Sequence, residues 1–176
     1  MAKAYAVSIL STTPGPVLLG GWSFGGVVAY EIALQLTAQG IQVKGIILID
    51  SPSPINHTPL TPPLINHILT LENPNIHNAK SAALIQKQFS SSSEMLSRYV
   101  PHATASLCPP LVLLRSVEGF SPSNGDKIQV PKWLEDRTDL QTSVAGWESL
   151  AHCTVKVLDI PGHHFSAFHP SNVSIL

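Results

Sequence analysis

The sequence predicts an α/β fold with a mostly parallel sheet, and two observations lead to this prediction. Four short β-type runs are spread along the 176 residues, and the first has no polar alternation, which is typical of a parallel strand buried on both faces. The first run leads into a longer stretch with helical spacing, so that strand and helix alternate. Hydrophobic residues make up 44% of the chain and charged residues 12%, which is typical of a single globular domain, here residues 1–176.

A serine stands where the first predicted strand, Val17–Gly20, meets a helix that is expected from Val27 to about Gln39. The strand is predicted to be central in the sheet. Residues 21–25 match the pattern G-x-S-x-G, and a tight turn between strand and helix is the setting of a nucleophile elbow, where flanking glycines leave room for the sharp turn. We therefore expect Ser23 to be a nucleophile and the backbone N–H of Phe24 to donate to an oxyanion. The alternative is a glycine-rich turn that only joins the two elements.

Two further apolar runs bring polar side chains to the same edge of the sheet. Ile46–Ile49 is followed at once by Asp50, and Val155–Leu158 leads into a loop that contains His164. Both side chains are expected at the carboxyl ends of parallel strands, where open α/β sheets bind ligands. A serine nucleophile needs a base, and the base needs an acid that holds its tautomer. The order Ser23, Asp50, His164 therefore predicts a catalytic triad with Asp50 as acid and His164 as base.

Other residues compete for two of these roles. The remaining apolar run, Leu111–Leu114, is followed by Glu118 and Asp126. Many hydrolases place the acid after the corresponding strand, so both carboxylates stay open as alternatives to Asp50. Three further histidines are weaker candidates for the base: His152, His163 and His169.

Residues 52–107 differ from the rest of the chain, with dense prolines and a serine run at 90–93. The segment is too long for a plain connection, so we expect a mobile helical lid insertion with helices over Ala79–Phe89 and Glu94–Val100. Three of its histidines fall ten residues apart: His57, His67 and His77. Because that spacing does not make metal ligands converge, we expect surface histidines and no metal site.

Charge and composition argue against several other functions. The net charge is −1, so nothing favours binding to nucleic acid or to an acidic membrane surface. No apolar run reaches the about 18 residues of a membrane span, and residues 2–10 indicate a short helix rather than a signal peptide. The two cysteines do not make a disulfide framework, and free thiols in a cytoplasmic protein are expected. Residues 130–147 show no regular pattern, and their tryptophans, Trp133 and Trp147, are expected to be packing anchors.

Three segments resemble thioesterase domains of polyketide and nonribosomal peptide synthases. Residues 15–26 are similar to the family's elbow, residues 47–52 to the strand end that carries its aspartate, and residues 162–165 to its G-x-H-F loop with the catalytic histidine. The likeness is closest to the C-terminal releasing domains of fungal iterative polyketide synthases. The resemblance implies an α/β-hydrolase fold. It also implies an acyl thioester substrate on the phosphopantetheine of an acyl carrier protein domain, no other cofactor, and release from a seryl ester by hydrolysis or cyclisation.

The chain departs from the family's pattern at both ends. The family has further strands before the elbow, with a loop that supplies a second oxyanion N–H, and a helix after the histidine loop. We therefore expect residues 1–176 to be a partial domain, truncated at the N-terminal side. Alone it is expected to be a poor catalyst, since losing one oxyanion donor costs about 10²–10³ in turnover. Two other hypotheses stay open: a stand-alone editing thioesterase or carboxylester hydrolase, and an inactive truncated remnant.

Overall fold

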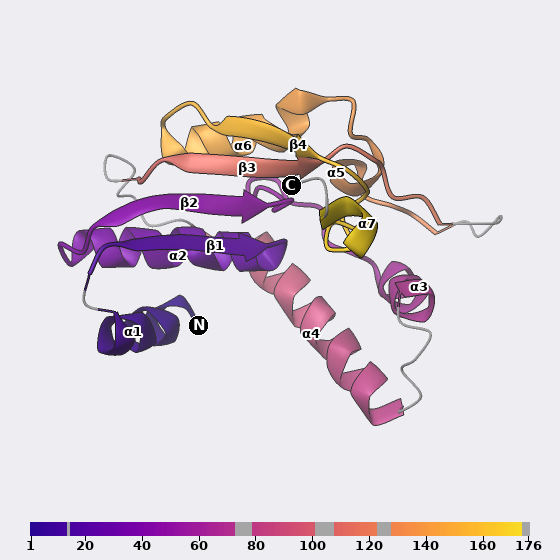
Figure 1. Ribbon diagram of the computed structural model, residues 1–176. Coiled ribbons are helices and arrows are strands. Elements are labelled where there is room, and N and C mark those ends of the chain that lie inside the picture. The colour runs from indigo at the N-terminus through magenta and orange to yellow at the C-terminus, as the bar shows by residue number, and fades with distance from the viewer. Residues whose placement is uncertain (14, 73–78, 101–107, 123–127, 174–176) are drawn as a thin grey trace.

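The computed structural model describes residues 1–13, 15–72, 79–100, 108–122 and 128–173. The helices and strands follow in this order: α1 (Ala2–Thr12), β1 (Val17–Trp22), α2 (Phe24–Ala38), β2 (Val43–Ile49), α3 (Pro62–Glu72), α4 (Ala79–Arg98), β3 (Leu111–Ser116), α5 (Lys132–Glu135), α6 (Leu140–Ala151), β4 (Lys156–Ile160) and α7 (Pro170–Val173). All four predicted strands are present, with ends that differ by a few residues from those expected. They form one parallel sheet (Figure 1), so the predicted α/β class is confirmed.

The strands lie side by side in chain order, β1-β2-β3-β4. Ile49 of β2 pairs with Trp22 of β1 and with Leu114 of β3, so the residues that follow these strands begin level with one another. In the described sheet β1 is an edge strand, and its Leu18 is 61% exposed. The prediction of a central position for Val17–Gly20 concerned the family's whole domain, so this sheet does not test it.

Helices cover one face of the sheet. In Figure 1, α2 and α6 lie behind the sheet, and the rings of Tyr30 and Trp147 meet there edge to face at 5.4 Å. The Tyr30 hydroxyl donates a hydrogen bond to the carbonyl oxygen of Leu150 (3.0 Å), which satisfies a buried polar group. On the opposite face Leu18 and Leu158 remain exposed among the described residues. The prediction that Val17–Gly20 is buried on both faces therefore holds for one face only.

The connection from β3 to β4 contains two helices. The expectation that residues 130–147 lack regular structure is wrong, because they contain α5 and most of α6. Trp147 is fully buried against α2, as expected of a packing anchor, and its Nε1–H donates to the carbonyl oxygen of Ser51 (2.9 Å). Tertiary packing thus stabilises a helix whose threonine, serine and glycine residues give it low intrinsic propensity.

The helices α3 and α4 project away from the sheet (Figure 1). The sequence did not predict α3, and α4 is one helix where two were expected, because serines are weak helix formers. Within the serine run, Ser93 is buried, and its Oγ accepts a hydrogen bond from the N–H of Leu60 (3.0 Å). Tyr99 then donates to Glu31 of α2 (2.6 Å), which ties the end of α4 to the core. The bounds of the lid, 52–107, and its mobility stay predictions.

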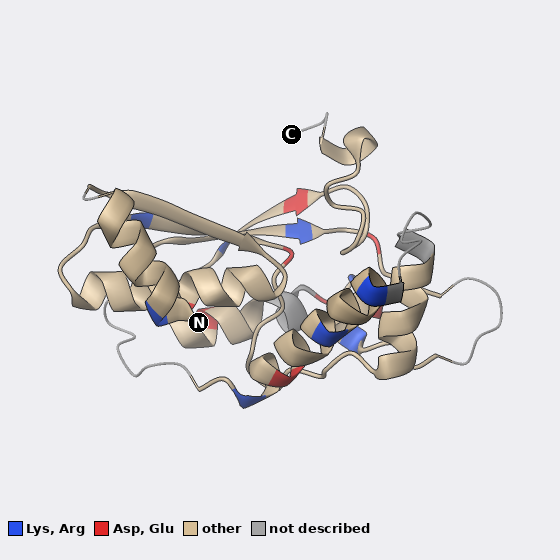
Figure 2. Ribbon diagram, turned by 90° about the horizontal axis from the view of Figure 1, so that it is seen from below, with Lys and Arg blue, Asp and Glu red and all other residues tan. Residues whose placement is uncertain are grey.

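Charged residues are few and of both signs. Figure 2 shows basic and acidic residues interspersed over helices, strands and loops, with most of the ribbon uncharged. Within the described part of the chain, no helix combines the length and the apolar character that crossing a membrane requires.

Candidate active site

The turn between β1 and α2 holds Ser23 in a strained conformation. Its φ of 53° and ψ of −126° lie outside the regions that residues with side chains prefer, at a cost of about 1–3 kcal/mol. A Cβ at Gly21 would overlap the backbone of Gly25, so the chain can turn this sharply only with glycine at position 21. A Cβ at Gly25 meets nothing within 4 Å. The expectation that both flanks need glycine is therefore correct for Gly21 only.

The loop after β2 holds this turn through hydrogen bonds. The Ser51 hydroxyl donates a hydrogen bond to the carbonyl oxygen of Ser23. A Cβ at Gly26 would overlap the Ser51 hydroxyl, so a second glycine is required in the first turn of α2. The Ser23 N–H in turn donates to the carbonyl oxygen of Ile49 at the end of β2 (3.0 Å). The serine is thus fixed by its neighbouring strand as well as by its own turn.

Phe24 is the first residue of α2. Its N–H belongs to the group of N–H donors at a helix start that have no partner within the helix. The positive end of the helix dipole lies at the same place. This placement, directly after Ser23, suits an oxyanion donor, and that role stays a prediction.

A line of hydrogen bonds joins the three residues of the predicted triad. Ser23 Oγ lies 2.9 Å from His164 Nε2, and His164 Nδ1 lies 2.8 Å from Asp50 Oδ2. His164 is 2% exposed and Asp50 is 4% exposed. A carboxylate only accepts hydrogen bonds, so Nδ1 carries the imidazole proton and Nε2 is left to accept from the serine hydroxyl. The contact expected between Asp50 and His164 is present.

The other candidates for the acid and the base do not join this line of hydrogen bonds in the described structure. Glu118 is exposed, and Asp126 lies outside the described residues. His152 and His169 are exposed as well. The ring of His163 packs on Phe120, with centroids 5.4 Å apart, and so diverges from that of its neighbour.

Aromatic rings enclose His164 on several sides. Trp22 stacks on it at 5.1 Å and donates from Nε1 to the His164 carbonyl oxygen (3.1 Å). Phe165 meets the imidazole edge-on at 4.9 Å, and Trp133 does so at 5.3 Å. Sequence reasoning missed Trp22, although it stands inside the G-x-S-x-G pattern. It also assigned Trp133 to packing alone, whereas Trp133 contacts the imidazole.

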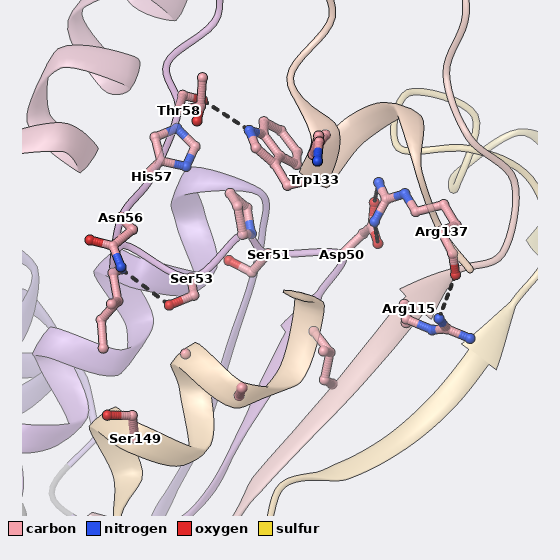
Figure 3. Close-up of a pocket in the computed structure, with 16 residues that line it drawn as sticks. Asp50, Ser51, Ser53, Asn56, His57, Thr58, Arg115, Trp133, Arg137 and Ser149 are labelled. Atoms are coloured by element: carbon pink, nitrogen blue, oxygen red, sulfur yellow. Dashed lines mark hydrogen bonds and ion pairs between the residues drawn. The ribbon is translucent and has the colours of Figure 1, made fainter. Parts of the chain in front are cut away.

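Asp50 has more partners than the sequence indicated. Its Oδ1 accepts hydrogen bonds from the N–H of Ser116 (2.9 Å) and from Arg137 Nη1 (3.2 Å), while Oδ2 accepts from Arg137 Nη2 (2.9 Å) and from His164. Asp50 itself has a φ of 43°. Figure 3 shows the guanidinium of Arg137 turned toward the carboxylate. No motif could reveal Arg137, because it lies in an irregular stretch 87 residues beyond Asp50.

Burial and nearby charges determine the protonation states of Asp50 and His164. Burial alone would raise the pKa of Asp50, but the His164 contact, the Arg137 charge and the Ser116 N–H together hold that pKa below its ordinary value. Burial lowers the pKa of His164, the bond to Asp50 opposes this, and the charges of Arg137 and His163 add to the lowering. At neutral pH the pair is therefore a carboxylate and a neutral imidazole.

The comparisons with known proteins bear on what such a triad does. Residues 1–176 match the thioesterase domain family over their whole length. This chain belongs to that family. It is 36% identical to an orsellinic acid synthase of Beauveria bassiana, over 99% of this chain and 9% of that protein. It is 32% identical to the thioesterase frbD of a Dothideomycetidae species, over 100% of this chain and 68% of that protein.

Among solved structures, the NocB thioesterase domain of the nocardicin cluster is 28% identical, with a TM-score of 0.72 over 99% of this chain and 67% of that one. The fold is thus the α/β-hydrolase fold, and the chain is a thioesterase of the serine-hydrolase type. This confirms the predicted family and fold. The thioesterase domain described here spans about a tenth of the length of the synthase it matches and about two thirds of frbD.

Two cavities adjoin the triad of this thioesterase domain. A small one of about 40 Å³ is lined by Ser23, His164 and residues of α4. A larger one of about 420 Å³, shown in Figure 3, lies beyond Asp50 and is lined also by loop and α6 residues. Three residues line both: Pro52, His57 and Trp133. The tilted rings of His57 and Trp133 (5.5 Å) therefore stand in the wall between them.

His57 and His67 are half-buried, so the predicted surface position is only partly correct for them. Burial lowers the pKa of His57 to about 4, so this ring is neutral at pH 7. His67 is half-buried against Phe120 (6.5 Å), and His77 lies outside the described residues. Within the described ranges, no cluster of three histidine, cysteine or carboxylate side chains is arranged to hold a metal.

Proposed function

We propose that this thioesterase domain releases a polyketide-type acyl chain from the phosphopantetheine arm of an acyl carrier protein through an ester on Ser23. The observation that carries the proposal is the continuous line from Ser23 through His164 to Asp50, in a chain of the thioesterase domain family. Relatives named as orsellinic acid synthases and non-reducing polyketide synthases support the nature of the acyl chain.

The geometry provides a role for each residue in acylation. His164 Nε2 takes the proton from Ser23 Oγ as the oxygen attacks the thioester carbonyl carbon. The Phe24 N–H donates to the oxyanion that forms. When the carbon–sulfur bond breaks, the pantetheine thiolate leaves with the proton held by His164. Asp50 stays ionised and stabilises the imidazolium throughout.

Release repeats these steps with a new nucleophile. A water molecule, or a hydroxyl or carbon nucleophile of the acyl chain itself, loses a proton to His164 and attacks the ester carbonyl. Ser23 Oγ then leaves and recovers the proton. The products are a free acid in the first case and a cyclic product in the others.

The cavity at Ser23 is small. The cavity at the serine, of about 40 Å³, has room for little more than one water molecule, whose share of liquid volume is about 30 Å³. Phe89, Ser93 and Leu96 of α4 form part of its wall. We propose that α4 shifts to make room for an acyl chain beside Ser23, as a lid would.

The relative frbD, whose name marks it only as a thioesterase, favours a second candidate: a stand-alone editing thioesterase. Rates on three substrates with one acyl group separate the candidates: the acyl carrier protein thioester, the free pantetheine thioester and a carboxylic ester. Release from a synthase predicts the highest kcat/KM on the carrier protein. Equal kcat/KM on carrier-bound and free pantetheine thioesters, with Ser23→Ala inactive on both, would favour the editing enzyme. Turnover that persists in Ser23→Ala would refute both.

A further inference from the structure

A buried guanidinium completes the hydrogen bonding of the triad carboxylate. Asp50 accepts four hydrogen bonds, two at each oxygen, and two of the four come from Arg137. In this ion pair the Arg137 side chain is 6% exposed and that of Asp50 is 2% exposed. A carboxylate offers about four lone-pair positions, so the contacts leave it no free acceptor site.

Arg137 is itself held in place by a second ion pair. Its carbonyl oxygen accepts a hydrogen bond from Arg115 Nη1 (2.9 Å), as Figure 3 shows. The Nε and Nη2 of Arg115 donate to the two carboxylate oxygens of Asp159 in β4 (2.9 and 3.0 Å). The chain of contacts therefore runs from Asp159 through Arg115 and Arg137 to Asp50, and it anchors the triad acid to strands β3 and β4.

We propose that Arg137 is a positioning residue that holds the Asp50 carboxylate in the one orientation that serves His164. The proposal rests on the function proposed above. It extends the triad to a four-residue line, Arg137, Asp50, His164 and Ser23, in which Arg137 acts through Asp50.

The Arg137 contacts fix the orientation of the Asp50 carboxylate. Rotation of a carboxylate about its last bond is broad and has no sharp minimum. The N–H of Ser116 fixes only Oδ1, so it leaves the plane of the carboxylate free to turn. The paired hydrogen bonds from Arg137 fix both oxygens, because a guanidinium matches a carboxylate in two places at once. With the plane fixed, the remaining lone pair of Oδ2 faces the imidazole.

The positive charge of Arg137 also acts on the pKa of His164. The charged and titratable groups that act on the pKa of His164 are Asp50, Arg137 and His163. Asp50 favours the imidazolium, and the positive charge of Arg137 disfavours it. Without Arg137 the unbalanced carboxylate would raise the pKa of His164. The base would then become neutral, and so active, only at higher pH.

Two variants separate orientation from charge. Arg137→Lys keeps the charge but cannot form the paired hydrogen bonds. We expect it to lower kcat/KM by about 10²-fold, the effect of a misplaced catalytic group, and to leave the acid limb of the pH profile in place. Arg137→Met removes both properties, so we expect a similar loss together with a shift of the acid limb to higher pH.

Arg115→Met is the matched control. It also removes a buried guanidinium and one of the contacts that hold Arg137, but it leaves the Arg137 charge beside Asp50, and its own carboxylate partner is Asp159. We expect the acid limb of Arg115→Met to stay where it is in the wild type. An equal shift in both methionine variants would show a general effect of lost charge and would overturn the proposal.

Guanidinium rescue covers the case in which Arg137→Met folds poorly. Arg137 lines the cavity of about 420 Å³, so Arg137→Ala opens a guanidinium-sized space that adjoins it. We expect millimolar guanidinium, far below denaturing concentrations, to restore part of the lost kcat/KM, and urea at the same concentration to restore none. Rescue by both, or by neither in a folded protein, contradicts the proposal.

An NMR titration of the His164 ring makes the proposal independent of turnover. We expect the midpoint for His164 to rise in Arg137→Met relative to the wild type. If it rises and no thioester is cleaved by either protein, the proposed function is wrong and the inference stands. If it does not move in a folded variant, the inference is wrong whatever the activity.

Discussion

Single residues in this domain have roles that only their neighbours explain. His163 and His164 are adjacent and chemically identical, yet one packs on Phe120 and the other reaches Ser23. The difference follows from the turn at residues 163–166, in which the N–H of Ser166 donates to the carbonyl oxygen of His163 (2.9 Å), and from the aromatic rings that enclose His164. Sequence patterns could place both histidines at the end of a strand and could name the one before Phe165 by resemblance. They could not show Trp22 stacked on it.

The two histidines are expected to respond very differently to removal. His164→Ala leaves Ser23 without a base, and in a comparable hydrolase such a loss costs on the order of 10⁶ in turnover. His163→Ala removes a contact with Phe120 and should cost less than about 10-fold, the effect of a small shift in loop position. Acylation rates by stopped flow provide the comparison. Equal losses, or a larger loss at His163, would contradict the assignment.

His57 is expected to make stability depend on pH. The pKa of His57 is about 4 in the folded protein and 6.5 in the unfolded chain. Between these values the unfolded chain binds a proton at His57 and the folded protein does not. The contribution of His57 to stability is therefore fully present above pH 6.5 and is lost as the pH falls toward about 4. Denaturant unfolding of His57→Gln should show a smaller decline over this interval than the wild type. The exposed His169→Gln is the control, and a wild-type slope in His57→Gln would show that His57 is not buried in solution.

At the scale of elements, the junction of β1 and α2 depends on close backbone contacts. The sequence predicted both elements and the turn between them, because strand, glycines and helix each have a strong local pattern. It could not show which glycine is indispensable, since that depends on Ser51 in a loop distant in sequence. The same reason explains the missed helix α6, which depends on Trp147 packing against α2.

Two alanine substitutions one residue apart are expected to have opposite effects. Gly26→Ala drives a methyl group into the Ser51 hydroxyl and should lower the free energy of unfolding by about 1–3 kcal/mol. Gly25→Ala meets nothing within 4 Å and should raise it by up to about 1 kcal/mol through helix propensity. Thermal and urea denaturation of the two variants measure both. Equal destabilisation would mean that the turn itself, and not the Ser51 contact, limits the site.

At the scale of the whole molecule, the sheet has two unequal faces. The apolar runs correctly predicted four parallel strands and the edge at which the active-site residues gather. They also predicted burial of β1 on both faces, because Leu18 is as apolar as Leu48 and only the packing of helices distinguishes them. The fold class therefore follows from local pattern, whereas the position of β1 at an edge and the covering of one face follow from the arrangement of distant segments.

A matched pair of leucines tests this asymmetry. Leu48 is fully buried between the sheet and its helices, so Leu48→Ala should cost about 2–5 kcal/mol of unfolding free energy. Leu158 is 45% exposed on the other face, so Leu158→Ala should cost less than about 1 kcal/mol. Urea denaturation at fixed protein concentration gives both values. A cost at Leu158 as large as that at Leu48 would show that this face is covered in solution.

The central claim, that Ser23 carries the acyl group, is tested most directly by trapping the covalent enzyme. The domain is mixed with an acyl carrier protein thioester or with a fluorophosphonate probe, quenched, and analysed by intact mass and peptide mapping. Ser23→Ala removes the proposed nucleophile. Ser92→Ala is the matched control, because Ser92 lines the same cavity without a base at hydrogen-bond distance in the described structure.

We predict one added acyl or phosphonyl group, located on Ser23, in the wild type and in Ser92→Ala, and none in Ser23→Ala. Labelling that persists in Ser23→Ala, or that maps to another residue in the wild type, would contradict the account.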